Sequence, residues 1–161
     1  MQQRCRGFTL IELLVVVTIG AVMAGLAVLS LGRWGDADAP REQLQRLAAL
    51  LEVQCEQALF QSRPRGIRLT EDGYDFWQAG SAGWVALPDQ GTSRQRRWPE
   101  PGQATLFLEG RRQALDAEIE QPQIICQPLG EITSFELELR AADRSARLSV
   151  SAGGRIELST S

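Results

Sequence analysis

The arrangement with the clearest chemical meaning is one carboxylate inside a long apolar stretch near the N-terminus. Residues 8–31 contain a single charged side chain, Glu12, close to the start of the stretch. A carboxylate costs about 2.5–3.5 kcal/mol at the centre of a bilayer, and less near the interface, so it calls for a cationic partner. A cut between Gly7 and Phe8 would create one, because the new α-amino group of Phe8 would lie one helical turn from Glu12.

The apolar stretch itself is long enough to span a membrane. Residues 8–31 would form a helix of about 36 Å, compared with a hydrocarbon core of about 30 Å. Arg4 and Arg6 precede the stretch, which predicts that the N-terminus stays in the cytoplasm and that the C-terminal part lies outside it. An ordinary signal peptide and an uncut signal anchor are disfavoured, because the run is too long for the first and Glu12 interrupts it early.

Composition excludes several classes of function. All 17 basic residues are arginine and the chain has no histidine, so histidine-based catalysis and histidine metal ligation are excluded. The net charge of −3 becomes −5, with 15 basic and 20 acidic side chains, if a leader carrying Arg4 and Arg6 is removed. This balance argues against a nucleic-acid partner. With no metal-ligand spacing and no nucleophile–base pair, we predict that the chain is not an enzyme and binds no cofactor or metal.

The chain has three cysteines, of which Cys5 would leave with a leader of seven residues. Cys55 and Cys126 remain, and an even pair in an extracytoplasmic domain is compatible with a disulfide. Two buried free thiols are the alternative, because cysteine often acts as a small core residue. The sequence leaves both interpretations open.

An amphipathic helix is predicted from Pro40 to about Ser62. Proline suits the first turn of a helix, and the Arg63-Pro64-Arg65-Gly66 segment ends it. Apolar side chains recur at helical spacing along this segment: Leu44, Leu47, Ala48, Leu51, Cys55, Ala58 and Leu59. The stripe predicts a helix laid on a folded domain, with Cys55 on its inward face.

The periodicity then changes to two, which predicts short strands. The expected strands are residues 66–70, 74–78, 84–87, 105–109, 123–127, 134–140, 146–152 and 155–159. Residues 88–102 have no period and predict a mobile surface loop. The predicted fold class is α+β: an N-terminal transmembrane and amphipathic helix followed by an antiparallel β domain of about seven or eight strands in two sheets.

The N-terminal residues resemble those of type IV pilins and type II secretion pseudopilins. The resemblance rests on the basic leader, the fifth mature position and the residues between them: Arg4, Arg6, Gly7, Phe8, Thr9-Leu10-Ile11 and Glu12. It covers about the first 30 residues, so it indicates the type IV pilin-like superfamily and not the member.

The second half resembles the minor pseudopilin H family of type II secretion. The matching segments are Pro122-Gln123-Ile124-Ile125-Cys126, Leu129-Gly130-Glu131-Ile132-Thr133-Ser134-Phe135 and Leu137-Glu138-Leu139. The FimT/FimU group of type IV pilus minor pilins shares this domain in part. Leu29 stands where major pilins usually have proline, and no acidic cluster follows Ser149 that could form the calcium site of the major pseudopilin. Both departures favour a minor subunit.

The resemblance implies a minor pseudopilin at or near the tip of the periplasmic pseudopilus, which drives export of folded proteins across the outer membrane. It also implies that a prepilin peptidase cuts between Gly7 and Phe8 and methylates Phe8, and that Glu12 neutralises the methylated amino group during assembly. The implied partners are other major and minor pseudopilins, the prepilin peptidase/methyltransferase, the inner-membrane assembly platform and the lipid bilayer. The alternative is a minor pilin of a type IV pilus, for adhesion, motility or DNA uptake.

The expected organisation has four segments. Residues 1–7 are a leader that is removed, and residues 8–31 are a transmembrane helix. Residues 32–62 link to the soluble domain and pack on it as a helix, and residues 63–161 form a periplasmic β domain. The protein would then be a single-pass protein of the bacterial inner membrane, with a cytoplasmic N-terminus and a periplasmic C-terminal domain.

Overall fold

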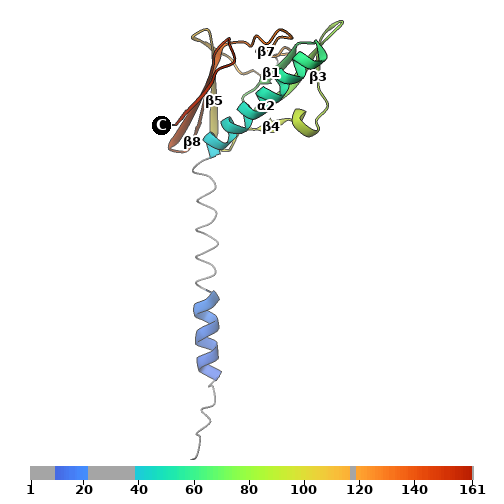
Figure 1. The fold of residues 1–161 in the computed structure, drawn as a ribbon. Coiled ribbons are helices and arrows are strands. Elements are labelled where there is room, and N and C mark those ends of the chain that lie inside the picture. The colour runs from blue at the N-terminus through green and yellow to red at the C-terminus, as the bar shows by residue number, and fades with distance from the viewer. Residues whose placement is uncertain (1–9, 22–38, 117–118, 161) are drawn as a thin grey trace, which may run out of the picture. The chain divides into compact units, whose positions relative to one another are not determined.

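The computed structural model describes residues 10–21, 39–116 and 119–160, which fall into two separate units, Met1–Ala37 and Asp38–Ser161 (Figure 1). In the first unit, residues 10–21 are helical. In the second, the long helix α2 (Ala39–Gln61) precedes two antiparallel sheets. Among the described residues, no helix has both the length and the apolarity needed to cross a membrane, and only residues 10–21 of the expected 8–31 helix are described.

The first sheet contains β1 (Arg65–Leu69), β2 (Gly73–Gly80), β3 (Gly83–Ala86), β4 (Arg96–Arg97) and β7 (Ile124–Cys126). Its order is β3–β2–β1–β7, and β4 also pairs with β2. A single turn of 3₁₀ helix, η1 (Gly91–Ser93), lies between β3 and β4. The expected strands at residues 66–70 and 74–78 correspond to β1 and β2, which pair in antiparallel register.

The second sheet contains β5 (Gly102–Leu108), β6 (Arg111–Gln113), β8 (Phe135–Ala141), β9 (Arg144–Val150) and β10 (Ile156–Thr160), in the order β10–β9–β8–β5–β6. The alternation predicted for β8 and β9 is confirmed. The inward side chains are all buried, namely Phe135, Leu137, Leu139, Ala146, Leu148 and Val150. The α+β class with two antiparallel sheets is therefore confirmed, with ten strands in the described residues where seven or eight were expected.

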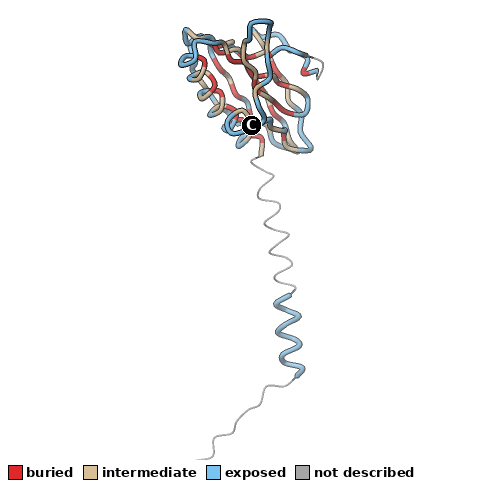
Figure 2. The backbone as a smooth tube through the Cα atoms, turned by 90° about the vertical axis from the view of Figure 1, so that its right-hand side faces the viewer, coloured by how far each residue is buried: buried red, intermediate tan, exposed pale blue. Residues whose placement is uncertain are grey.

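Helix α2 packs against strands of both sheets and supplies one side of the core (Figures 1 and 2). Its buried positions follow a spacing of three and four residues: Leu44, Leu47, Leu51, Gln54 and Ala58. The expected inward position of Leu59 is wrong, because this side chain is 48% exposed. Leu59 directly follows Ala58, so it points about 100° further round the helix. Gln54 takes the remaining inward position, although it is polar.

The segment expected to be a mobile loop, residues 88–102, instead contributes to the core. It contains β4, and its Trp98 is only 5% exposed. The Trp98 indole Nε1 donates a hydrogen bond to the Thr70 carbonyl at 3.0 Å, and its ring lies 5.0 Å from that of Tyr74. Glycine is required at position 73, because a Cβ there would lie 1.9 Å from the Arg96 carbonyl oxygen. A two-residue strand and one aromatic anchor carry no period, so the sequence pattern could not reveal them.

A disulfide between Cys55 and Cys126 joins α2 to β7. The two Cα atoms lie 5.0 Å apart, although the residues are 71 positions apart in the chain. Cys126 is almost fully buried and pairs with Arg65 in the first sheet. The bridge therefore attaches the last turns of the helix to the edge strand of that sheet.

The Tyr74 ring lies against the rings of Phe76 and Trp98, and its hydroxyl is buried. Burial raises the pKa of Tyr74 to about 12, while the nearby positive charges of Arg96 and Arg46 oppose the rise. The hydroxyl has no hydrogen-bond partner among the described residues. The folded domain therefore strongly favours the neutral phenol.

The ionisation of Tyr74 should couple to folding at high pH. Because the folded pKa is raised from 10.0 to about 12, the stability gained from a neutral Tyr74 is fully present below pH 10 and is lost as the pH rises towards 12. Tyr74 is the single tyrosine, so the tyrosinate absorbance reports this group alone. We expect a native titration well above that in denaturant, and Tyr74→Phe should abolish the signal. Native ionisation near pH 10 would contradict the buried environment.

The disulfide can be tested in a fragment that begins near Trp34, which retains only Cys55 and Cys126. Thiol titration in denaturant without reductant should find no reactive thiol, and reduction should release both. On the chain-entropy model, opening a loop of this size lowers the free energy of unfolding by about 4 kcal/mol. A Cys55→Ala, Cys126→Ala double variant should not respond to reductant. Two reactive thiols before reduction would show that the bridge does not form.

Candidate functional site

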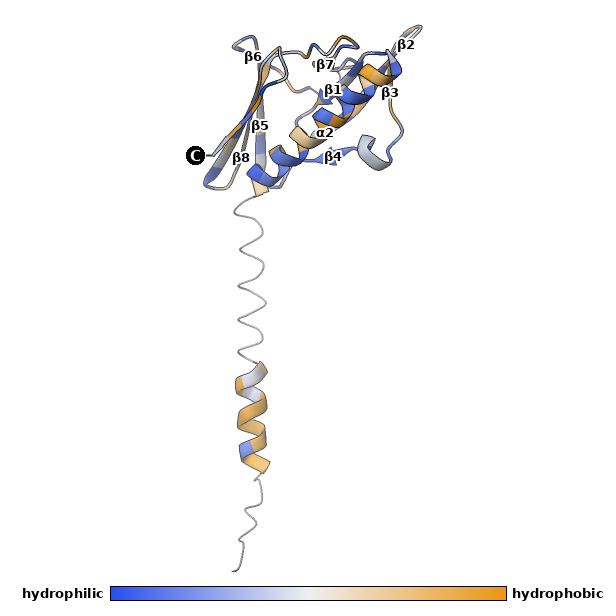
Figure 3. Cartoon of the chain, in the orientation of Figure 1, coloured by the Kyte–Doolittle hydropathy of each residue, from blue (hydrophilic) through white to orange (hydrophobic). Residues whose placement is uncertain are grey.

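The helix at residues 10–21 is apolar on all sides, as its hydropathy shows (Figure 3). Its large side chains are exposed around the whole circumference, from Val15 at 46% to Leu10 at 90%. A helix of this kind is stable where an apolar medium or other helices cover it, because its exposed apolar surface is otherwise unfavourable in water. The described part of the first unit is therefore a segment that requires apolar surroundings.

The two polar side chains of this helix behave differently. The Thr18 hydroxyl lies 2.9 Å from the carbonyl oxygens of both Leu14 and Val15, so its hydrogen bonding is satisfied within the helix. This is the arrangement expected of a hydroxyl in a medium without water. Glu12 carries the only charge between residues 10 and 21, and its side chain lies on the exposed surface of the helix. In an apolar environment, its carboxylate can form an ion pair with a cationic group.

The expected site residues fall in different parts of the chain. Gly7 and Phe8 lie outside the described residues, whereas Glu12 lies on the helix of the first unit. Cys55 and Cys126 belong to the second unit, where they form the disulfide. Among the described residues, no group of three or more histidine, cysteine, aspartate or glutamate side chains could hold a metal ion.

A buried polar cluster lies beside the disulfide, and the sequence pattern did not predict it. The Arg65 guanidinium is 8% exposed, and its Nη1 donates to Gln54 Oε1 at 2.6 Å and its Nη2 to Gln61 Oε1 at 3.1 Å. Gln54 Nε2 in turn donates to the Thr92 carbonyl at 3.3 Å. Burial lowers the pKa of Arg65, but an arginine still keeps its proton at neutral pH.

This cluster links α2 to β1 and to the turn at η1 through amide oxygens rather than carboxylates. It positions the helix and offers no nucleophile or general base. The one signal in the sequence was Gln54 at an inward helical position, three residues after Leu51 and four before Ala58. Its partner, Arg65, could not be identified from helical spacing because it lies on a strand.

A half-buried ion pair occupies the other face of β1. Arg68 Nε donates to Asp75 Oδ1 at 3.0 Å, and its guanidinium lies 4.9 Å from the centre of the Trp77 ring. Hydrogen bonding to Asp75 raises the pKa of Arg68. Trp77 Nε1 also donates to Asp75 Oδ1, at 2.7 Å. All three side chains are thus engaged in holding β1 and β2 together.

Two family models match the chain. The prokaryotic N-terminal methylation motif matches residues 2–28, and the type II transport protein GspH model matches residues 43–154. The first match contains Gly7, Phe8 and Glu12, and the second covers α2 from residue 43 onwards and strands β1 to β9. The first match therefore falls on the N-terminal apolar stretch, and the second on the C-terminal domain.

Relatives of known identity agree with these matches. The type II secretion system protein H of Pseudomonas aeruginosa is 35% identical, over 92% of this chain and 91% of that protein. The protein of the same name from Aeromonas hydrophila is 28% identical, over 91% of this chain and 86% of that protein. The crystal structure of the minor pseudopilin EpsH from the type II secretion system of Vibrio cholerae has the same fold. Its TM-score is 0.64 at 21% identity, over 76% of this chain and 96% of that one.

These relatives are a type II secretion system protein H and a minor pseudopilin of a type II secretion system. The alternative of a type IV pilus minor pilin is not favoured by them. The GspH model covers most of the chain, and the Pseudomonas aeruginosa relative matches nearly its full length. The chain therefore belongs to the minor pseudopilin H family of the type II secretion system.

Proposed function

We propose that this minor pseudopilin is held in the inner membrane by residues 8–31, after removal of residues 1–7, and that its C-terminal domain works in the periplasm at or near the tip of the pseudopilus. The observation that carries the proposal is the helix at residues 10–21, which is apolar all round and has one charge at Glu12. The methylation motif at residues 2–28 supports it.

Membrane insertion would cover the exposed apolar side chains of this helix. Full burial of one leucine or valine side chain contributes about 1.5–3 kcal/mol, so a helix of this composition gains far more than the carboxylate costs. The remaining cost falls on Glu12. Cleavage after Gly7 would place the α-amino group of Phe8 within reach of it, in the same chain or in a neighbouring subunit. Methylation of that amine would leave its positive charge in place.

The between-chain pair would also set the axial register of a subunit in the fibre. Each charge alone is unfavourable in hydrocarbon, and together they offset much of that cost. Only one axial offset between neighbouring helices brings the two groups together. Glu12 is therefore an assembly residue in this proposal, whereas the rest of the helix packs against lipid and against other subunits.

The C-terminal domain would meet other subunits outside the membrane. Residues 32–62 would carry the chain from the membrane onto the domain, and residues 63–161 would form the periplasmic body. The proposed partners are the major and other minor pseudopilins, the inner-membrane assembly platform and the prepilin peptidase/methyltransferase. The chain would be a substrate of that enzyme, with no catalytic role, cofactor or nucleic-acid partner of its own.

Cleavage between Gly7 and Phe8 predicts a defined change of mass. Intact-mass analysis of the membrane-extracted protein should show loss of residues 1–7 and gain of one methyl group. A bulky side chain should block the cut, so Gly7→Val should accumulate precursor. Gly7→Ala is the matched control and should be processed at least in part, because alanine is small. Normal maturation of the valine variant would contradict the proposed cleavage site.

Replacement of Glu12 by glutamine should separate insertion from assembly. Glu12→Gln removes the charge but keeps the size, so the variant should still be cleaved and inserted. Without the ion pair, we expect crosslinking to other pseudopilins and secretion to fall by about tenfold, as for a loss of about 1.4 kcal/mol. Thr18→Val is the control, because the Thr18 hydroxyl bonds to carbonyls of its own helix. Wild-type crosslinking and secretion in Glu12→Gln would show that Glu12 is not an assembly residue.

A further inference from the structure

Strand β5 is only partly covered along one of its edges. On one side it pairs with β8 along its whole length, from Gly102 to Leu108. On the other side β6 pairs only with residues 106–108, and the chain then leaves the sheet after Gln113. In the part of the chain that the structure describes, residues 102–105 therefore have no partner strand on that side.

The register identifies the backbone groups that face this open edge. Strands β5 and β6 are joined by a two-residue turn, Glu109–Gly110, in which both φ angles are positive. In such a hairpin the flanking pair exchanges hydrogen bonds, and so does every second pair beyond it. The alternation places the N–H and C=O of Ala104 on the open side, away from β8. Among the described residues, no strand or turn bonds to either group.

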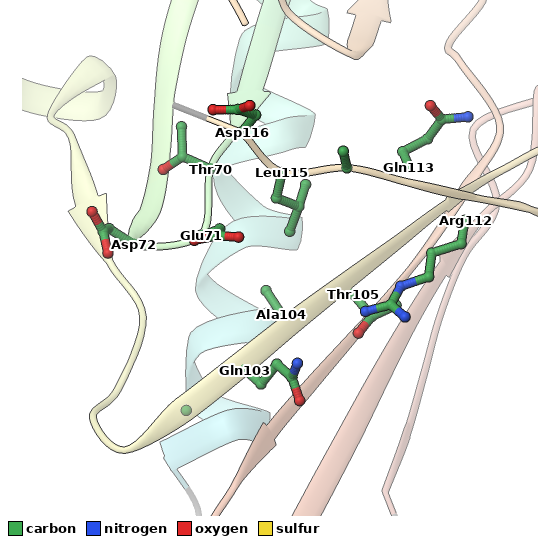
Figure 4. Close-up of a pocket in the computed structure, with 12 residues that line it drawn as sticks. Thr70, Glu71, Asp72, Gln103, Ala104, Thr105, Arg112, Gln113, Leu115 and Asp116 are labelled. Carbon is green, nitrogen blue, oxygen red and sulfur yellow. The ribbon is translucent and has the colours of Figure 1, made fainter. Parts of the chain in front are cut away.

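The open edge lies along a preformed cleft of about 830 Å³ (Figure 4). The opposite wall is the turn between β1 and β2, residues 70–72, and residues 112–116 close one end of the cleft. The turn is held on both sides: Glu71 N donates to the Leu115 carbonyl at 2.9 Å, and Trp98 N donates to the Asp72 carbonyl at 2.9 Å. Leu115 is itself buried and fixes the position of its segment.

The size of the cleft suits a short extended segment of polypeptide. Four residues of strand span about 13 Å, which is the length of the unpaired part of β5. The volume falls within the range of about 300–1,000 Å³ that is common for ligand clefts. Among the described residues, β10 also has an edge without a partner strand. The open edge of β5 differs from that of β10 because the turn at residues 70–72 faces the β5 edge across a cleft.

The charges along the cleft are unequal. The exposed carboxylates of Glu71 and Asp72 lie towards one end, and Arg112 lies towards the other (Figure 4). An adjoining cleft of about 520 Å³ shares Glu71, Asp72 and Gly102 and adds the carboxylate of Glu100. A bound segment would therefore gain most from a basic side chain at the end near Glu71 and Asp72.

We propose that residues 102–105 form a strand-addition site for an extended segment of another polypeptide that carries an arginine or lysine. The segment pairs with the N–H and C=O of Ala104, and its basic side chain lies against Glu71 and Asp72. Backbone pairing provides the affinity, and the carboxylates provide the preference for charge. The site belongs to the second unit alone, so it does not depend on the processing or membrane anchoring of the first.

The proposal can be tested with capped pentapeptides and the isotopically labelled full chain in detergent micelles. Two of the probes are Thr-Val-Arg-Val-Thr and its counterpart Thr-Val-Glu-Val-Thr. The third is the arginine peptide with N-methyl groups on the backbone nitrogens that point to either edge of the strand. We expect the arginine peptide to shift the Ala104 amide resonance and those of Glu71 and Asp72. It should bind about fivefold more tightly than the glutamate peptide. N-methylation should abolish binding, because it removes the donors needed for pairing.

Two pairs of variants separate backbone pairing from charge. Ala104→Pro removes the N–H that faces the cleft but no bond to β8, whereas the control Ala104→Ser keeps that N–H. The proline variant should lose at least about fivefold in affinity, and the serine variant should match the wild type. Glu71→Gln and Asp72→Asn should reduce the preference for the arginine peptide without changing binding of the glutamate peptide by a comparable factor.

Several outcomes would overturn the proposal. These are an unshifted Ala104 amide at millimolar arginine peptide, or equal binding of the N-methylated and unmodified peptides. If Ala104→Pro fails to fold, the N-methylated peptide alone decides the question on the wild-type chain. A second copy of the chain is the competing occupant. Self-association that is lost in Ala104→Pro but kept in Ala104→Ser, with no peptide effect, would identify the edge as a site for that copy instead.

Discussion

The packing of α2 across both sheets is the contact on which the C-terminal domain depends. The helix contributes buried side chains at positions 44, 47, 51, 54 and 58, and these meet strands from both sheets. The helix covers inward-facing side chains of both sheets, so the two sheets and the helix form one core. The disulfide and the Arg65–Gln54 hydrogen bond then fix the C-terminal half of the helix to the first sheet.

The helix at residues 10–21 differs from α2 in how its apolar side chains are distributed and covered. Helix α2 has one buried face and an opposite face of charged residues, so it is stable on a folded domain in water. Residues 10–21 have no polar face, and their large apolar side chains are exposed. The same chain thus carries one helix that its own domain covers and another that needs an apolar medium or other helices. The proposed membrane anchoring of this subunit rests on this difference.

A fibre subunit also needs lateral contacts outside the membrane. The second sheet leaves residues 102–105 of β5 unpaired on the side of β6, which gives space for such a contact. Strand β6 is short, and the chain after it crosses to the turn between β1 and β2 instead of continuing along β5. The crossing segment holds the turn in place while leaving half of the β5 edge open. One local departure from regular pairing therefore creates both a fixed wall and an unpaired strand edge.

The sequence by itself determined the features that depend on local spacing. The helical stripe predicted α2 to within a residue at each end, and alternation predicted the inward faces of β8 and β9, because these periods follow from backbone geometry alone. The N-terminal motif and the segments around Cys126 indicated the family by their resemblance to known members, not by periodicity. Only the tertiary structure decided which distant groups meet. These contacts are the Cys55–Cys126 disulfide, the Gln54–Arg65 hydrogen bond, the Trp98–Tyr74 ring contact, and the pairing of β6 with only residues 106–108 of β5. Such pairs depend on where the chain returns after tens of residues, and no local period records that.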